Sequence, residues 1–332
     1  MGTMEFSDLA RLASGHVEAR IIQAAVELSL FDCLADQSLD AAQVAAAMGT
    51  DLRATELLLN SLTALSLLEK KGEQFSLSTA AKTYLVAHSP KSLCGMIRFD
   101  ASLWNCWEGL ADAVRSGKPA RPADMYQETP AETETFIQAM DSLVKARGDA
   151  EVLANAMDWE NVTDLLDIGS GPATYPIHLC RRYPKLRATI FDLPGTLKIT
   201  ERYVREAQLE SRIKLLSGDY RNDPIPGRYD AIFLSNIIHG EGDDENQKLM
   251  LKLAANLKSD GRIIIKDHIL DKTRANPAVG AIFSLPMLLT TASGRCYSFN
   301  EVKSWLENAG LSRVRQIDLP PPLTSSLIIG VK

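Results

Sequence analysis

Apolar positions recur with helical periodicity through the first 90 residues. The apolar side chains of 17–30 lie close to helical spacing, and 53–68 carries leucines along one stripe. Between these helices, Asp40 is typical of the start of a short helix that Gly49 ends. Two short strands are expected over 68–77, around a glycine turn. This order of elements is the layout of a winged helix-turn-helix.

The charges of this region decide between two uses of that layout. Residues 1–90 hold six Lys or Arg against eleven Asp or Glu. The helix in the place of a recognition helix, 53–68, has Arg53 as its cation and also carries Glu56. A DNA-binding helix needs a basic stripe there, so dimerisation or packing is favoured over nucleic-acid binding.

A helical connector is expected next, with a polar break over 116–122 and a second helix over 130–157. Trp104 and Trp107 are spaced to share one face of the first helix. They would either pack in a core or line an apolar substrate pocket.

From residue 161 onward, strand patterns alternate with helix patterns. The expected strands are 163–168, 187–191, 213–216, 229–234 and 261–266. The expected helices are 175–183, 195–207, 244–257 and 300–309. Two further strand-like runs, 312–319 and 326–331, close the chain. Strands separated by helices form a parallel sheet that is covered on both faces.

This pattern predicts an α/β fold, a Rossmann-like doubly wound sheet preceded by a mainly helical winged-helix domain. The last two runs are too close together for a crossover helix, so one of them should be an antiparallel strand at the sheet edge. We expect a dimerisation domain over 1–95, a helical connector contributing to the substrate pocket over 96–160, and a cofactor-binding domain over 161–332.

Composition restricts the setting of the protein. Its 332 residues carry 36 basic and 42 acidic side chains, and the net charge of −6 disfavours nucleic acid and anionic membranes. No apolar run approaches the roughly 20 residues that span a bilayer, and the first 20 residues lack a signal-peptide pattern. Five scattered cysteines suggest neither a disulfide framework nor a zinc site. A cytoplasmic protein without a metal site is expected.

The most informative residues follow the first predicted strand. Gly169 and Gly171 form a Gly-x-Gly turn between strand and helix, where backbone can approach a ligand closely. Asp192 ends the next strand, where a carboxylate can accept both ribose hydroxyl protons of a nucleoside. Thr174 occupies the place of the third small residue of dinucleotide-binding sites, so a dinucleotide is disfavoured. Asp219 ends the third strand, where it could accept from an adenine amino group.

At these residues the sequence resembles the class I S-adenosylmethionine-dependent methyltransferases, and within them the small-molecule O-methyltransferases of the plant caffeate and bacterial tailoring type. The resemblance covers nearly the whole chain, including the N-terminal dimerisation region. The segments that carry it are 165–171, 191–194, 217–220, 229–239, 257–265 and 299–311. It implies a homodimer that transfers the methyl group of S-adenosylmethionine to a hydroxyl of a small aromatic molecule.

The resemblance also implies roles for individual residues. His239 matches the general base, and Asp267 matches a carboxylate that orients it. The cofactor contacts implied are Asp167, Gly169, Ser170 and Gly171 around the methionine part, Asp192 and Leu193 at the ribose, Gly218, Asp219 and Tyr220 at the adenine, and Ser235.

Departures from the family pattern leave alternatives open. Gly240 follows the base where the family usually has Asp, Ser235 replaces a common Lys, and Cys296 stands where a second carboxylate is common. His239 would then be oriented mainly by Asp267. The same fold also supports C- or N-methylation, or non-methylating chemistry with bound S-adenosylmethionine. A winged-helix ligand-sensing regulator is a further alternative.

Overall fold

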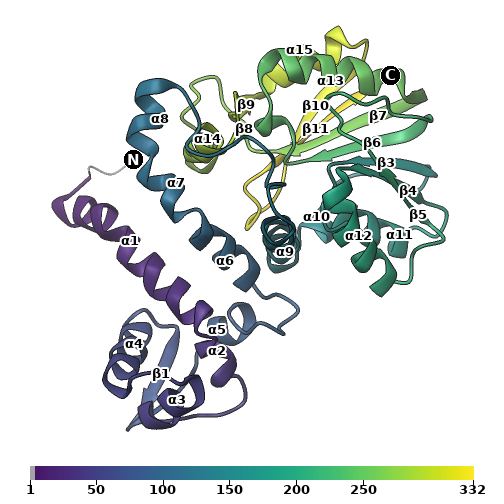
Figure 1. The fold of residues 1–332 in the computed structure, drawn as a ribbon. Coiled ribbons are helices and arrows are strands. Elements are labelled where there is room, and N and C mark those ends of the chain that lie inside the picture. Colours follow the sequence, from purple (N-terminus) through teal and green to yellow (C-terminus); the bar gives the residue numbers. More distant parts are fainter. Residues whose placement is uncertain (1–3) are drawn as a thin grey trace. The chain divides into compact units, whose positions relative to one another are not determined.

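The structure is a computed structural model that describes residues 4–332 (Figure 1). The chain forms two compact units. The first contains the residues up to 103 together with 138–146, and the second contains 104–137 and 147–332. The three-part division by residue ranges stays a prediction.

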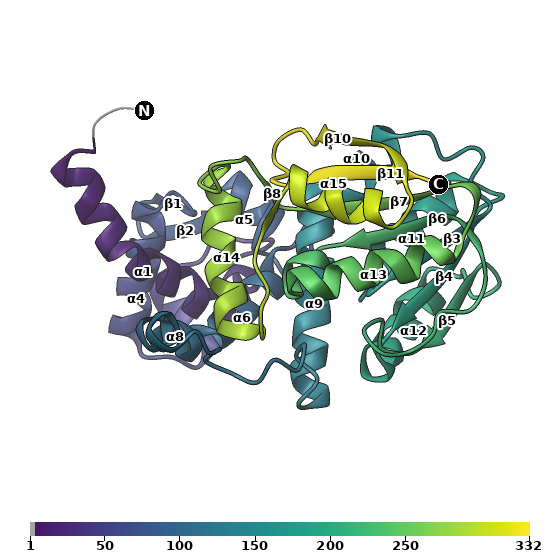
Figure 2. The ribbon, with the colours of Figure 1, turned by 90° about the horizontal axis from the view of Figure 1, so that it is seen from above.

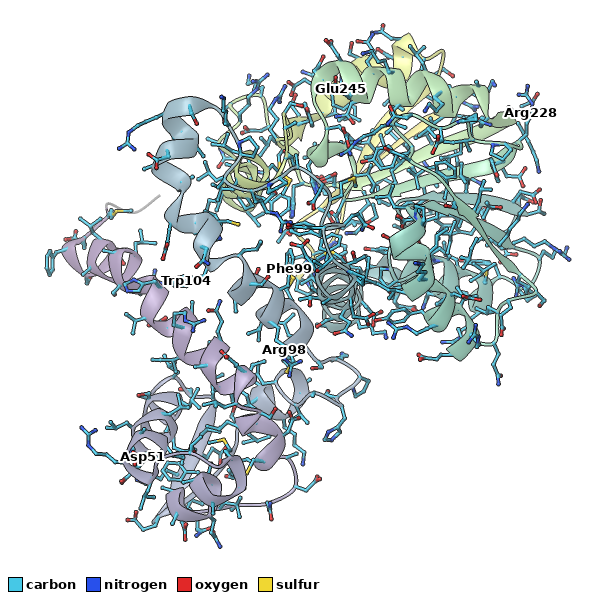
Figure 3. All side chains as sticks on the ribbon, viewed as in Figure 1. Asp51, Arg98, Phe99, Trp104, Arg228 and Glu245 are labelled. Carbon is cyan, nitrogen blue, oxygen red and sulfur yellow. The ribbon has the colours of Figure 1, made fainter. Side chains whose placement is uncertain are left out.

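The first unit is mainly helical with a two-stranded antiparallel sheet. Its elements are α1 (Phe6–Glu27), α2 (Leu30–Cys33), α3 (Ala41–Met48), α4 (Leu52–Ala64), β1 (Leu68–Lys71), β2 (Gln74–Leu77), α5 (Thr79–Tyr84) and α6 (Cys94–Ser102). Asp40 caps α3 by accepting the Gln43 N–H, and Gly49 ends it in the left-handed region, as expected. Asp51, labelled in Figure 3, caps α4 in the same way.

Two helices of this unit differ from the sequence expectation. α1 begins at Phe6 rather than near residue 17. Its first half is exposed, so no buried stripe marks it in the sequence. α4 ends at Ala64, because Ser66 adopts a left-handed conformation and Leu68 already begins β1.

The second unit is built on a seven-stranded sheet of order β10-β11-β7-β6-β3-β4-β5. The strands are β3 (Asp164–Ile168), β4 (Arg187–Asp192), β5 (Ile213–Ser217), β6 (Tyr229–Ser235), β7 (Leu257–Asp267), β10 (Ser312–Asp318) and β11 (Ser326–Val331). β3 to β7 are parallel, which confirms the doubly wound α/β fold. The antiparallel strand is β11, one place in from the edge, because β10 pairs outside it.

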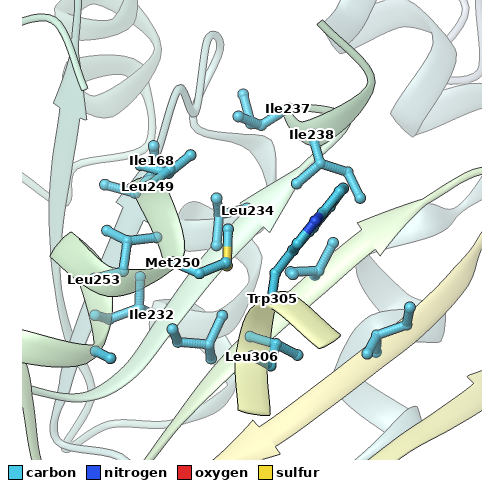
Figure 4. Packing of buried hydrophobic residues seen from close by; sticks show 14 of the residues in the cluster. Ile168, Ile232, Leu234, Ile237, Ile238, Leu249, Met250, Leu253, Trp305 and Leu306 are labelled. Carbon is cyan, nitrogen blue, oxygen red and sulfur yellow. The ribbon is translucent and has the colours of Figure 1, made fainter. Parts of the chain in front are cut away.

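Helices cover both faces of this sheet (Figures 1 and 2). They are α11 (Thr174–Arg182), α12 (Pro194–Glu206), α13 (Asp243–Ala255) and α15 (Phe299–Asn308). Figure 4 shows α13 and α15 packing Met250 and Trp305 against strand residues such as Leu234. This buried cluster forms the hydrophobic core on one face of the sheet.

Several elements of this unit were not expected from the sequence. The strands β8 (Ile269–Leu270) and β9 (Tyr297–Ser298) form a short parallel pair, and α14 (Ala278–Thr290) lies between them in the sequence. The helical connector that the sequence predicts contains α7 (Trp104–Glu108), α8 (Leu110–Ser116) and α10 (Asp149–Ala156), whereas the 3-10 helix η1 (Ile238–Gly240) was not expected. The helix expected over 130–157 is two helices, α9 (Pro130–Arg147) and α10, because Gly148 between them is left-handed. Trp104 and Trp107 share α7, and Trp107 is 39% exposed rather than part of a core.

Candidate active site

The turn after β3 is built for close approach. Gly169 and Gly171 both have positive φ, and a Cβ on Gly169 would lie 2.5 Å from Ile237 Cδ1. The Gly171 N–H donates to Asp192 Oδ2 over 2.9 Å. The carboxyl ends of β3 and β4 are thereby joined directly.

Two buried carboxyl groups lie at this edge. Burial raises the pKa of Asp192 to about 6, although the Gly171 and Leu193 N–H groups donate to it. Burial raises the pKa of Asp167 to about 8, with Ser170 Oγ donating to Oδ2 over 2.6 Å and the charge of Asp192 adding to the rise. Within residues 4–332, neither carboxyl interacts with a cationic side chain. A ligand that carries positive charge would lower both pKa values.

The turn after β5 presents Gly218, Asp219 and Tyr220. A Cβ on Gly218 would lie 2.4 Å from Phe191 Cζ, so this backbone packs tightly on β4. The Asp219 carboxylate accepts the Arg221 N–H over 2.9 Å and thereby shapes its own turn. Tyr220 is buried, and its hydroxyl donates to Glu241 Oε1 over 2.6 Å.

His239 and Asp267 meet at the ends of β6 and β7. The His239 Nδ1–Asp267 Oδ1 distance is 2.7 Å, and both residues are buried. Burial alone would raise the pKa of Asp267, but the interactions with His239 and the His268 N–H outweigh it, so this pKa lies below its ordinary value. A carboxylate can only accept, so Nδ1 carries the hydrogen and Nε2 of a neutral ring is free to accept a proton.

Asp267 and His268 are consecutive, and alternation along a strand would turn their side chains to opposite faces. β7 ends at Asp267, so the alternation stops there. The rings of His268 and His239 each lie 4.9 Å from the ring of Phe283, centroid to centroid. Phe283, on α14, was not predicted, because an apolar helix in the sequence does not tell which of its residues faces a site.

Glu241 has an environment that its local sequence does not indicate. The charged run 241–245 is by itself typical of a solvated helix start, yet Glu241 is buried and accepts from Tyr220 and Arg221. Its partners follow a different strand, β5, so no local pattern could identify them.

A buried ionic cluster was also missed. Lys266 and Asp149 are both fully buried, with 3.0 Å between Nζ and Oδ2. Asp149 also accepts two hydrogen bonds from Arg147 and one from the Tyr175 hydroxyl. The sequence did offer one signal for this cluster, namely the charged residue Lys266 at the end of the largely apolar run 261–266.

The other positions singled out are also located. Ser235 ends β6, and its hydroxyl is buried without a hydrogen-bond partner in the described part of the chain. Cys296 is buried, and burial together with the charge of Asp267 raises the pKa of its thiol to about 12. An acidic group of Asp124, Glu128 and Glu132 lies elsewhere in this unit, and Arg121 already pairs with two of its members. Across residues 4–332, every helix is too short or too polar to cross a membrane.

The fold is that of a Rossmann-like α/β protein with buried carboxyl groups at its strand ends. Comparison with known proteins specifies the class further. A family model described as an O-methyltransferase domain matches residues 107–312, and one described as an O-methyltransferase dimerisation domain matches 10–87.

Individual relatives agree along the whole chain. The 3-hydroxy-5-methyl-1-naphthoate 3-O-methyltransferase of Streptomyces sahachiroi is 31% identical over 330 residues, covering 98% of this chain and 94% of that protein. The tetracenomycin polyketide synthesis 8-O-methyl transferase TcmO of Streptomyces glaucescens is 31% identical over 332 residues, covering 98% and 96%. The crystal structure of human N-acetylserotonin methyltransferase in complex with S-adenosylmethionine superimposes with a TM-score of 0.90 at 26% identity, covering 100% of this chain and 99% of that one.

The chain belongs to the O-methyltransferase family. It is an S-adenosylmethionine-dependent O-methyltransferase with a dimerisation domain, which confirms the resemblance inferred from the sequence.

Proposed function

We propose that this enzyme methylates a hydroxyl group of a small aromatic molecule, with His239 as the general base. The observation that carries the proposal is the 2.7 Å contact between His239 Nδ1 and Asp267 Oδ1. It holds the imidazole with Nε2 as the proton acceptor. Removal of the hydroxyl proton turns a poor nucleophile into a good one.

Asp267 acts as the positioning residue for this base. Its lowered pKa keeps it ionised near neutral pH, so it stabilises the imidazolium that forms when Nε2 takes the proton. The His268 N–H also donates to Asp267 Oδ1 over 2.7 Å and fixes the carboxylate. Cys296, close by, carries no charge, so Asp267 performs this task without a second carboxylate.

The strand ends fit the cofactor of the family. S-adenosylmethionine supplies a methyl group activated by a sulfonium. Asp167, with Gly169, Ser170 and Gly171, would hold its methionine part, where a buried carboxyl without a cationic partner suits a positive ligand. The other proposed contacts are Asp192 and Leu193 at the ribose, Gly218, Asp219 and Tyr220 at the adenine, and Ser235.

An aromatic acceptor is supported by the relatives and by the side chains near His239. The names of the two Streptomyces relatives specify a hydroxynaphthoate and a tetracenomycin polyketide. Phe283 lies edge-on against His239 on the apolar helix α14, which also carries the buried Met287. An aromatic ring would pack favourably there.

We further propose a homodimer formed through the helical N-terminal region, with no nucleic acid or membrane as partner. α1 exposes large apolar side chains, including Phe6, Leu9 and Leu12. Exposed apolar patches of this kind mark interaction surfaces. A cytoplasmic location stays a prediction.

The test uses the purified enzyme, labelled S-adenosylmethionine and a panel of hydroxynaphthoates and other phenols. The expected product is heavier by one methyl group in place of one hydrogen, with S-adenosylhomocysteine released. Replacement His239→Ala should lower turnover by about 100-fold or more with nearly unchanged cofactor affinity in calorimetry. His88→Ala, at an exposed position of the other unit, is the control. Turnover of His239→Ala equal to that of the control would refute the base assignment, and an unmethylated product would favour non-methylating chemistry.

A further inference from the structure

Glu241 lies two residues after the proposed base, and it is 6% exposed. Its Oε1 accepts the Tyr220 hydroxyl over 2.6 Å and Arg221 Nε over 2.8 Å. Both partners belong to the turn after β5, the proposed adenine turn. A single buried carboxylate therefore joins the segment of the base to the turn of the nucleoside.

The segment that carries His239 is held on its other sides as well. The Tyr297 hydroxyl donates to the Glu241 carbonyl over 2.6 Å, and Asn246 Nδ2 donates to the Ile238 carbonyl over 2.8 Å. These contacts fix the backbone on either side of His239. The Glu241 side chain then links this segment to the adenine turn.

The adenine turn has a second support of a different kind. Lys252, on α13, donates from Nζ to the carbonyls of Tyr220, Arg221 and Asp223 over 2.8 to 3.3 Å. This contact holds the turn through its backbone without touching the segment of His239. Lys252 is therefore a natural comparison for Glu241.

We infer that Glu241 is a positioning residue that holds the His239 segment and the adenine turn in one hydrogen-bonded unit, so that it sets both nucleoside affinity and base orientation. The inference rests on the proposed function of both parts. Charge-assisted hydrogen bonds in a buried site are strong and directional, so one side chain can fix two backbone segments. The replacement Glu241→Gln keeps an oxygen that can accept from the Tyr220 hydroxyl. It removes the negative charge that pairs with the Arg221 guanidinium and places a neutral amide there instead.

The experiment compares the full-length enzyme with Glu241→Gln in two measurements that need no acceptor. Calorimetry measures the affinity for S-adenosylhomocysteine. Proton NMR measures the downfield resonance of the His239 Nδ1–H, identified by its disappearance in His239→Ala. Glu241→Gln should weaken S-adenosylhomocysteine about tenfold and should also broaden or remove the resonance.

Three further variants separate positioning from other effects. Asp244→Asn removes a nearby exposed charge and should change neither measurement. Lys252→Met should weaken S-adenosylhomocysteine but retain the resonance. Tyr220→Phe removes one of the two links to Glu241 while leaving Arg221 in place, and it should give a smaller change of both measurements than Glu241→Gln.

The outcomes distinguish this inference from the proposed function. If the unchanged enzyme does not bind S-adenosylhomocysteine, the cofactor assignment fails. If it binds, and Glu241→Gln matches Asp244→Asn in both measurements, the inference is overturned. It is also overturned if Glu241→Gln weakens binding but retains the resonance, or if the unchanged enzyme lacks the resonance. Should Glu241→Gln fail to fold, Tyr220→Phe decides by the same two measurements.

Discussion

Lys266 and Asp149 show how a buried charge is accommodated in this protein. Burial lowers the pKa of Lys266 despite the charge of Asp149, which means that removal from water outweighs the attraction. Asp149 is also bound by Arg147 through two hydrogen bonds and by the Tyr175 hydroxyl. One buried carboxylate therefore serves two cations.

These contacts predict unequal effects for the two partners. Asp149→Asn leaves Arg147 and Lys266 facing each other without a counter-charge, and it should lower the free energy of unfolding by about 3–5 kcal/mol. Lys266→Met leaves Asp149 paired with Arg147, and it should stay within about 1 kcal/mol of the unchanged protein. Urea denaturation followed by circular dichroism measures both. Equal destabilisation by the two replacements would contradict this account.

At the scale of elements, the placement of η1 depends on a close backbone contact. A Cβ on Gly294 would lie 2.3 Å from the His239 carbonyl oxygen and 3.0 Å from the Gly240 carbonyl carbon. Thr291 Oγ1 is also near, at 2.6 Å, but the other two atoms belong to the backbone, so the segment of His239 or the backbone at Gly294 would have to move. Gly240, by contrast, has open space within 4 Å of an added Cβ.

This pair of glycines gives a matched prediction. Gly294→Ala should lower methyl-transfer turnover by about 100-fold, because small misplacements of a reacting group are costly. Its affinity for S-adenosylhomocysteine should fall much less than turnover, because the turns after β3 and β4 are not displaced and only the Glu241 link to the turn after β5 is disturbed. Gly240→Ala should retain turnover. Steady-state kinetics with any acceptor from the phenol panel measures the difference, and similar turnover of the two variants would show that this contact does not place the base.

At the scale of the whole molecule, α1 is the feature that a single chain leaves unexplained. Phe6, Leu9 and Leu12 are 85%, 58% and 61% exposed. A helix with large apolar side chains in water is costly, and a second copy of the chain would bury them. The match of 10–87 to a dimerisation domain is consistent with this use.

The corresponding prediction is a change of oligomeric state. The double replacement Leu9→Glu with Leu12→Glu should convert the proposed dimer to a monomer in light scattering coupled to size-exclusion chromatography. Leu57→Glu changes a leucine that is 55% exposed on α4, and it should leave the dimer intact. If the double variant remained a dimer at the same protein concentration, α1 would not be the interface.

Much of the fold was predictable because it is encoded locally. The alternation of strands and helices after residue 161 predicted the parallel sheet, and the Gly-x-Gly turn at 169–171 predicted a tight turn at its carboxyl edge. α14 and the early start of α1 were missed, since one is apolar on most sides and the other is exposed. The place of β11 inside β10 was missed because strand order depends on pairing between distant segments.

The sequence by itself determined the fold class, the family and the residue types at each strand end. These features depend on the spacing of apolar residues and on turn-forming residues, both of which are local along the chain. Only the tertiary structure decided that His239 lies 2.7 Å from Asp267, that Glu241 is buried against Tyr220 and Arg221, and that Lys266 pairs with Asp149. The physical reason is that a charged side chain finds its partner across space. From the sequence alone a charged residue is expected to be exposed to water, and only the packing of the folded chain shows that it is buried.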